Sequence, residues 1–211
     1  MNYIAHINQK SVDDINAAAV GFISMRGWRL GSFIAIFDPS LEKVLMTKLG
    51  RYAQDAIGGL PWTLPGGAVA SEEMPSQAAL RELREETGLS SPSNLNVAAW
   101  LTRPYFKSRR QNIRGELIIL FAGIDKTSGA GLRPAPPETL DCKFYRFNLE
   151  EWLCIPAQGK GVHPLAPLPR HWIYWTLMAQ RVLINPDLLP FIYEYESPKA
   201  MASPPIGLQL E

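Results

Sequence analysis

Short stretches of apolar and β-branched residues recur along most of the chain and predict a series of strands. The stretch at 117–124 is almost continuously apolar, which is typical of a strand that is buried on both faces. Asp38, Pro39 and Ser40 are turn residues between two such stretches, and they predict a hairpin. The predicted strands span residues 17–25, 31–37, 43–48, 62–64, 95–103, 117–124 and 142–148.

A helix is predicted in the middle of this series, directly after a cluster of residues that break regular structure. Residues 64–67 read Leu-Pro-Gly-Gly, so the chain should turn sharply there. Pro75 suits a first helical position, where its missing N–H is not needed. Gly88 suits the left-handed residue just past a helix end. Strands that flank a central helix predict a mixed α/β fold.

The polar face of this predicted helix is unusually acidic. Glu82, Glu85 and Glu86 are spaced i, i+3 and i+4, which places the three carboxylates on one stripe. Like charges at this spacing repel one another and weaken a helix by a few tenths of a kcal/mol per pair. A hard divalent cation such as Mg²⁺ prefers oxygen ligands and would neutralise the repulsion. The alternative is an ordinary acidic surface helix.

Residues 67–89 resemble the Nudix box, the signature of the Nudix hydrolases. The family pattern is Gly, five residues, Glu, seven residues, Arg-Glu, an aliphatic residue, any residue, Glu-Glu, any residue, Gly and an aliphatic residue. Its fixed places are filled by Gly67, Glu73, Arg81, Glu82, Leu83, Glu85, Glu86, Gly88 and Leu89. The resemblance implies a mixed sheet sandwiched between helices, and hydrolysis of the diphosphate linkage of a nucleoside diphosphate derivative.

Splitting a P–O–P bond with water requires a nucleophile and a means of spreading charge over phosphoryl oxygens, and divalent metals supply both. The resemblance implies Mg²⁺, with Mn²⁺ as a substitute. We assign the metal ligands and catalytic carboxylates to Glu82, Glu85 and Glu86, with the carbonyl of Gly67 as a further ligand. Arg81 is assigned to orienting these carboxylates, and Glu73 is its expected partner.

Many Nudix enzymes draw their general base from outside the box, and two glutamates are candidates here. Glu116 begins a predicted strand and Glu138 lies in the loop before the next one. Either could also be an ordinary surface carboxylate, and Glu86 could serve if it holds the attacking water. A base must lie within hydrogen-bond reach of the proton it removes, so geometry has to decide.

Two residues give competing hints about the substrate. Pro104 lies sixteen residues after Gly88, a spacing that resembles the ADP-ribose pyrophosphatases, although a proline can also simply end a strand. Tyr105 instead resembles a residue of the dinucleoside polyphosphate subgroup. Because Arg binds phosphate oxygens in a bidentate fork, we also expect substrate contacts from the basic cluster between residues 103 and 114, unless it is only a solvated loop. The substrate-binding candidates are Arg103, Tyr105, Arg109 and Arg110.

The length of 211 residues predicts one domain with extensions. We expect an N-terminal arm at 1–16, the Nudix domain at 17–155, and a C-terminal extension at 156–211. The extension combines one helix at 170–184 with a Pro-rich tail. That helix is rich in aromatic residues, so it should be covered by its own core or by a second subunit, which leaves a homodimer open.

The composition limits the kinds of partner and the cellular compartment that we expect for this chain. The formal net charge of +1 argues against a nucleic-acid partner, and no apolar run is long enough to span a membrane. Cys142 and Cys154 are expected to be buried free thiols, which fits a cytoplasmic location.

The best prediction is a Nudix pyrophosphatase for ADP-ribose or a nucleotide sugar. The alternatives are a nucleoside triphosphate or dinucleoside polyphosphate pyrophosphohydrolase and a non-catalytic nucleotide-sensing module.

Overall fold

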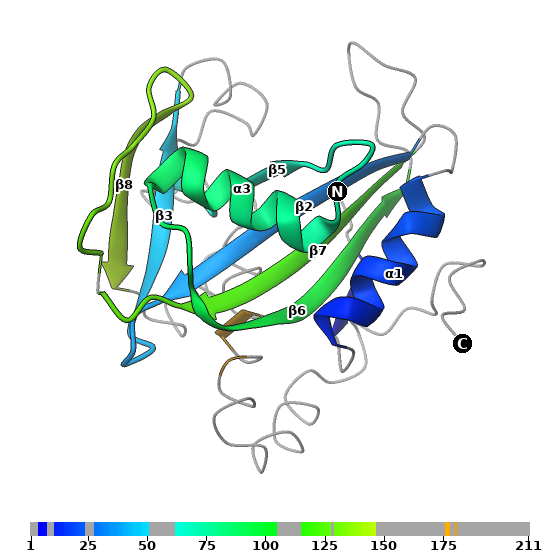
Figure 1. The fold of residues 1–211 in the computed structure, drawn as a ribbon, viewed down its shortest axis with the longest axis horizontal. Coiled ribbons are helices and arrows are strands. Elements are labelled where there is room, and N and C mark those ends of the chain that lie inside the picture. Colours follow the sequence, from blue (N-terminus) through cyan, green and yellow to red (C-terminus); the bar gives the residue numbers. More distant parts are fainter. Residues whose placement is uncertain are drawn as a thin grey trace, which may run out of the picture.

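The computed structural model describes most of the first 146 residues and three positions of the C-terminal region (Figure 1). The described residues are 4–7, 11–23, 28–50, 62–104, 115–127, 129–146, 176–177 and 180. The helices are α1 (Val12–Ile23) and α3 (Pro75–Thr87). The strands are β1 (Ile4–Ile7), β2 (Trp28–Phe37), β3 (Lys43–Leu49), β4 (Trp62–Thr63), β5 (Gly66–Ala68), β6 (Ser93–Pro104), β7 (Gly115–Ile124) and β8 (Thr139–Arg146).

All of these strands join one mixed sheet. Its main path runs β1-β6-β7-β2-β3-β4, while β5 pairs with β2 and β8 pairs with β3. The pairing of β2 with β7 is parallel, and the other pairings are antiparallel. The predicted hairpin is confirmed, because β2 and β3 pair antiparallel with Phe37 opposite Val44.

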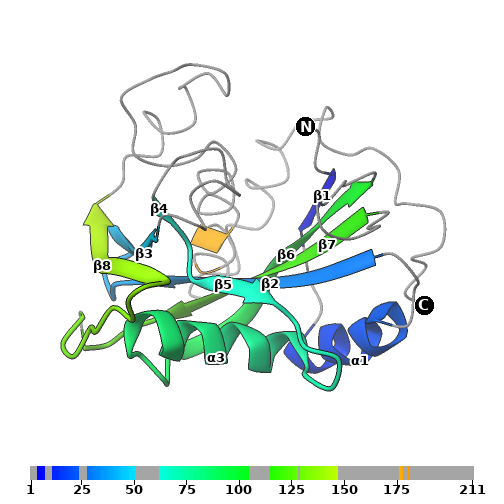
Figure 2. The same cartoon turned by 90° about the horizontal axis from the view of Figure 1, so that it is seen from above.

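The sheet is covered on both faces. Helices α1 and α3 lie on one face, and the helical residues 176, 177 and 180 lie on the other (Figure 2). Residues that alternate along β2, β3 and β7 therefore enter two different cores. This arrangement confirms the predicted α/β fold with a mixed sheet between helices.

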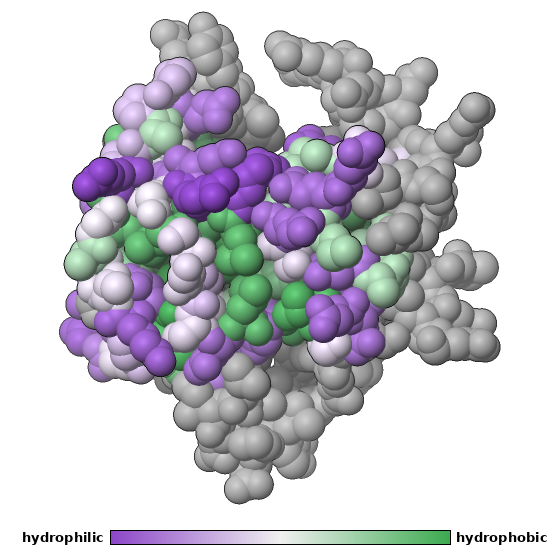
Figure 3. All heavy atoms as spheres, in the orientation of Figure 1, coloured by the Kyte–Doolittle hydropathy of each residue, from purple (hydrophilic) through white to green (hydrophobic). Residues whose placement is uncertain are grey.

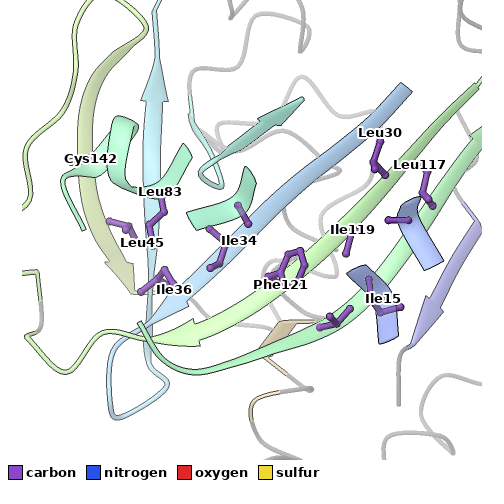
Figure 4. Close-up of a cluster of buried hydrophobic side chains, with 13 residues drawn as sticks. Ile15, Leu30, Ile34, Ile36, Leu45, Leu83, Leu117, Ile119, Phe121 and Cys142 are labelled. Atoms are coloured by element: carbon purple, nitrogen blue, oxygen red, sulfur yellow. The ribbon is translucent and has the colours of Figure 1, made fainter. Parts of the chain in front are cut away.

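The helix-side cluster packs beneath α1 and α3 (Figure 4). It consists of Ile15, Ala19, Leu30, Ile34, Ile36, Leu45, Ala79, Leu83, Val97, Leu117, Ile119, Phe121 and Cys142. The far-side cluster consists of Ala35, Phe37, Val44, Met46, Trp62, Leu64, Ala98, Ala99, Ile118, Leu120, Ala122 and Leu177. Leu177 is fully buried, so this part of the predicted C-terminal helix packs into the core of its own chain.

The predicted strand at 17–25 is wrong, because residues 17–23 belong to α1. The apolar pattern does not reveal the start of this helix, which depends on the polar residues before it. The Ser11 hydroxyl accepts a hydrogen bond from the Asp14 N–H at 3.1 Å, and the Asp14 carboxylate accepts one from the Ser11 N–H at 3.1 Å. This reciprocal pair is a capping box, which commits the following residues to a helix.

The N-terminal region is also more ordered than a loose arm. Residues 4–7 form β1, which pairs antiparallel with β6, and α1 runs across the boundary predicted between residues 16 and 17. The boundary predicted at 155–156, the Pro-rich tail and most of the helix at 170–184 lie outside the described residues. The division into domains therefore stays a prediction.

The remaining strands occur close to their predicted positions. The continuously apolar stretch forms β7, and every residue at 117–124 except Gly123 appears among the buried core side chains. The last strand begins at Thr139 and ends at Arg146, slightly earlier than expected. Cys142 is a buried free thiol, as predicted, and Cys154 lies outside the described residues. Within the described part of the chain, no helix is both long and apolar enough to cross a membrane.

Candidate active site

The acidic helix is held in place by its ends. Pro75 is its first residue, and the Met74 N–H just before it donates to the Gln77 side chain at 3.0 Å. Gly88 follows the helix with φ of 80°, and its N–H donates to the Arg84 carbonyl at 2.9 Å. Both the proline start and the glycine end are therefore as the sequence predicts. Strongly hydrophilic residues gather along this side of the molecule (Figure 3).

The loop before α3 lies flat on the sheet rather than turning freely. Gly66 and Gly67 form most of β5, with Gly67 opposite Ser32 of β2. Gly66 has φ of 149°, and a Cβ there would lie 2.6 Å from the Phe33 Cα, so only glycine fits. A Cβ on Gly67 would lie 2.5 Å from Oε1 of Glu82. The backbone of the loop is thus packed directly against a carboxylate of the helix.

Arg81 is the centre of an ion-pair network. Its Nε and Nη2 donate to the two carboxylate oxygens of Glu73 at 2.8 and 3.1 Å, a bidentate fork. Its Nη1 donates to Oε1 of Glu82 at 2.9 Å and to Oε2 of Glu85 at 3.0 Å. Nη2 also reaches the Ala68 carbonyl at 3.3 Å. The guanidinium therefore ties the loop before the helix to two carboxylates of the acidic stripe.

This network fixes the charge states of its two main partners. The Arg81 hydrogen bonds hold the pKa of Glu73 below its ordinary value, against a smaller opposing effect of burial. The same bonds, led by the one to Glu73, raise the pKa of Arg81. Glu73 is therefore ionised and paired with Arg81 at neutral pH.

Glu86 has the opposite environment. Burial, and after it the negative charge of Glu82, raise its pKa to about 8. Hydrogen bonds from the Gly66 N–H, at 3.3 Å, and from the Thr47 side chain only partly offset these effects. The pKa of Glu82 is also raised, mainly by burial, although Arg81 opposes the shift. The surroundings of Glu86 thus disfavour its charged form, so without a cation this carboxyl is mostly protonated at neutral pH.

The donor chemistry of this site fits a hard divalent cation, which prefers carboxylate and carbonyl oxygens. Glu82, Glu85 and Glu86 share the acidic stripe, and the absence of a side chain at Gly67 lets the loop backbone approach Glu82. As the side chains stand, no three His, Cys, Asp or Glu residues in the described part of the chain converge on one point. Nη1 of Arg81 contacts both Glu82 and Glu85, so a cation would have to share these carboxylates with the guanidinium.

The two candidate bases lie in different places. Glu138 is exposed on the loop before β8, and its charge raises the pKa of both Glu82 and Glu86. Glu116 is buried on β7, with its Oε1 3.8 Å from the Arg29 Nε. Because side chains alternate along a strand, Glu116 shares the face of Ile118, opposite the face that α3 covers. The charge of Glu138 therefore acts on the carboxylates of the acidic stripe, whereas Glu116 lies on the opposite face of the sheet.

The predicted substrate-binding residues fall largely outside the described part of the chain. This applies to Tyr105, Arg109 and Arg110. Arg103 and Pro104 belong to β6, where the Arg103 backbone lies opposite Glu116, but only their backbone is described. Their role in binding stays a prediction.

Sequence reasoning missed Thr47 and Gly66 as partners of Glu86. Thr47 lies on β3 opposite Thr63, so it reaches the site only through the folded sheet. No spacing in the sequence relates it to the box. Gly66 could have been found from the sequence, because its neighbour Gly67 is already assigned to the site as a metal ligand.

Comparison with known proteins agrees with the geometry. A model of the NUDIX domain matches residues 27–166. The putative 8-oxo-dGTP diphosphatase of Bacillus subtilis (strain 168) is 34% identical over 110 residues, which cover 52% of this chain and 68% of that protein.

Two similar solved structures share the fold at low sequence identity. The first is the NUDIX domain of Shewanella oneidensis NrtR, complexed with ADP ribose. It is 18% identical with a TM-score of 0.53, and the match covers 76% of this chain and 91% of that one. The second is a MutT/nudix family protein from Enterococcus faecalis, 17% identical with a TM-score of 0.51, covering 82% and 69%.

Proposed function

This chain belongs to the Nudix family, and from that premise we propose that it is a divalent-cation-dependent hydrolase of a diphosphate linkage in a nucleotide. The observation that carries the proposal is the pair of opposite carboxylate environments around α3. Arg81 compensates the charge of Glu73, whereas burial disfavours the charged form of Glu86, which a bound cation would stabilise in place of a proton. A module that only senses a nucleotide has no need of these crowded carboxylates.

In the proposed mechanism, Glu82, Glu85, Glu86 and the Gly67 carbonyl would hold the cation. When bound, it supplies neutralisation of the phosphoryl oxygens and activation of water. Arg81 holds Glu82 and Glu85 in orientation, and Glu73 fixes Arg81 through its fork. We assign the proton acceptor to the Glu138 carboxylate rather than to Glu116, because the charge of Glu138 raises the pKa of Glu82 and Glu86, whereas Glu116 lies across the sheet from α3.

The relative with 34% identity supports a purine nucleoside triphosphate, in the manner of 8-oxo-dGTP, as the substrate. Hydrolysis would then give the nucleoside monophosphate and pyrophosphate. A second candidate is ADP-ribose or a nucleotide sugar. It is supported by the position of Pro104 after the box and by the ADP-ribose complex of the structural neighbour. ADP-ribose would give AMP and ribose 5-phosphate.

The test is a hydrolysis screen of the full chain with Mg²⁺. The substrates are 8-oxo-dGTP, dGTP, ADP-ribose, nucleotide sugars and dinucleoside polyphosphates, and products are identified by ion-exchange chromatography. Glu85→Gln should lose most activity, whereas Glu72→Gln is the matched control, because Glu72 is an exposed glutamate of the loop before α3. Release of pyrophosphate supports the triphosphate reading, and release of AMP from ADP-ribose supports the second candidate. Nucleotide binding without turnover would replace the enzyme by a sensor.

A further inference from the structure

Helix α1 lies beside the start of α3 on the same face of the sheet (Figures 1 and 2). It precedes residues 27–166, so it lies outside the part of the chain that matches the NUDIX domain model. The contact between the two helices includes a buried polar pair. Asn16 of α1 is 6% exposed and Ser76 of α3 is 8% exposed. Buried polar groups are costly unless they are hydrogen-bonded, so this contact needs an explanation.

Asn16 and Ser76 satisfy each other reciprocally. The Asn16 Nδ2 donates to the Ser76 Oγ at 2.8 Å, and the Asn16 Oδ1 accepts from the Ser76 backbone N–H at 3.2 Å. Both groups of the side-chain amide are therefore used on one residue of α3. A second bond fixes the same turn to the sheet, because the Ser32 hydroxyl donates to the Pro75 carbonyl at 2.7 Å.

The start of α3 needs an acceptor from elsewhere in the chain. The first N–H groups of a helix have no partner within the helix and are ordinarily met by an oxygen of the N-cap side chain. Here the N-cap residue is Met74, which has no side-chain oxygen, and Pro75 has no N–H. The Ser76 N–H is met by Asn16, which lies 60 residues earlier. Asn16 thus caps α3 from another helix.

We propose that Asn16 is a positioning residue for the metal-binding carboxylates, an inference that rests on the proposed function. Ser76 lies three residues after Glu73, so the cap fixes the point where the loop that carries Glu73 enters the helix. Glu73 holds Arg81, and Arg81 contacts Glu82 and Glu85. Releasing Ser76 lets the Glu73 loop move relative to the helix and loosens the carboxylates that Arg81 orients.

The experiment measures Mn²⁺ affinity by calorimetry on the full chain, together with amide hydrogen exchange of residues 75–80. Asn16→Ala should raise the Mn²⁺ dissociation constant about tenfold, in the range expected for residues that orient metal ligands. It should also speed exchange at the start of α3. Asn16→Asp keeps an acceptor for the Ser76 N–H and hydroxyl, so its affinity should stay within about twofold of wild type.

Ser11→Ala is the matched control, because it weakens the start of α1 without contacting α3. It should lower thermal stability and leave the Mn²⁺ affinity unchanged. The proposal is overturned if Asn16→Ala binds Mn²⁺ as tightly as wild type. It is also overturned if Ser11→Ala or Asn16→Asp loses as much Mn²⁺ affinity as Asn16→Ala. If Asn16→Ala does not fold, Ser76→Ala takes its place. That variant keeps the backbone N–H that Asn16 caps, so Asn16→Leu, which has a similar size and no acceptor, is measured beside it, and wild-type affinity in Asn16→Leu would overturn the proposal.

These measurements separate the two proposals. Metal affinity and amide exchange need no turnover, so a wild-type protein that hydrolyses none of the screened nucleotides but binds Mn²⁺ still tests Asn16. Activity that persists in Asn16→Ala at unchanged Mg²⁺ requirement would overturn the positioning role and leave the hydrolase intact. A wild-type protein that binds no Mn²⁺ would overturn both.

Discussion

Glu73, just before α3, and Glu86, in its last turn, are carboxylates of the same box in opposite electrostatic environments. Both oxygens of Glu73 accept hydrogen bonds from one guanidinium, and the pKa of Glu73 is lowered. Glu86 is partly buried near Glu82, its described hydrogen bonds come from neutral donors, and its pKa rises to about 8. The chain itself compensates the first charge, whereas the second can be compensated only by a proton or by a cation from solution.

This difference separates two kinds of residue that a sequence motif treats alike. The charges of Glu73 and Arg81 compensate each other in the folded chain, and the role proposed for this pair is to orient the site. Glu86 lies where its own negative charge is disfavoured, so in the metal-free protein it holds a proton that a bound cation would displace. Four experiments test how far this division holds.

The largest effect is expected on catalysis from Glu86→Gln. Loss of a charged cation ligand should lower kcat/KM by about 10³-fold, because a metal ion contributes several kcal/mol of transition-state stabilisation. Steady-state assays over a Mg²⁺ series measure this loss. A variant that keeps more than a tenth of wild-type activity would show that Glu86 is not a ligand and would remove the contrast with Glu73.

The second effect is a pH-dependent stability of the metal-free protein. A carboxyl whose folded pKa is raised binds its proton more tightly in the folded state, so its contribution is present below the unfolded pKa and is lost as pH rises toward 8. At about 1.4 kcal/mol per pH unit, the free energy of unfolding should fall by about 3 kcal/mol between pH 5 and 7.5. Thermal melts in EDTA measure it.

Glu86→Gln is the control for this titration. It removes the charge and keeps a side chain of the same shape, so its melting temperature should change little over the same pH range. At pH 8 without metal it should be more stable than wild type, and added Mg²⁺ should stabilise only the wild-type protein. A wild-type melting temperature that rises steadily with pH from 5 to 8 would contradict the raised pKa.

The third effect is expected from Arg81→Lys, which changes the residue that compensates the charge of Glu73. Lysine keeps the charge but cannot form the fork to Glu73 while contacting Glu82 and Glu85. We expect a loss of roughly 10- to 100-fold in kcat/KM, mainly as a higher Mg²⁺ requirement, as for residues that orient ligands. Saturating Mg²⁺ should restore much of the rate. A loss as large as that of Glu86→Gln at all Mg²⁺ concentrations would mean that Arg81 acts on the substrate directly.

The smallest effect on stability is expected from Glu138→Gln. Glu138 is exposed, and its charge contributes less to the raised pKa of Glu86 than burial or Glu82 does. The midpoint of the titration should move down by a few tenths of a unit, worth less than about 0.5 kcal/mol. Its rate effect is separate. If Glu138 is the proton acceptor, the pH–rate profile loses its acidic limb, and an unchanged profile would return the role of base to Glu86 or Glu116.

Much of this arrangement can be predicted from local sequence. Pro75, Gly88 and the i, i+3, i+4 carboxylates define α3 because helix ends and helix faces depend on neighbouring residues. The uninterrupted apolar run of β7 likewise predicts a strand buried on both faces, and the structure has one. The failure at residues 17–23 is also local, since the capping box of Ser11 and Asp14 was present in the sequence but outweighed by the apolar run.

The rest depends on contacts between distant segments, which spacing does not encode. Thr47 reaches Glu86, and Asn16 reaches Ser76, only once the sheet and both helices are assembled. The placement of Glu116 across the sheet from α3 follows from the strand alternation of β7 together with the position of the helix, and neither alone determines it. The two charge environments of the box are products of the fold.

The parallel pairing of β2 with β7 has a consequence for how the protein acquires its activity. The paired residues lie roughly 90 positions apart, and the whole box lies in the loop that this pairing closes. Closing so long a loop is slow, because the entropy of closure is lost before the contacts form. During synthesis β7 emerges after the carboxylate helix, so the sheet beneath that helix is completed only then. Metal binding should therefore appear late in refolding, in step with burial of the central strands.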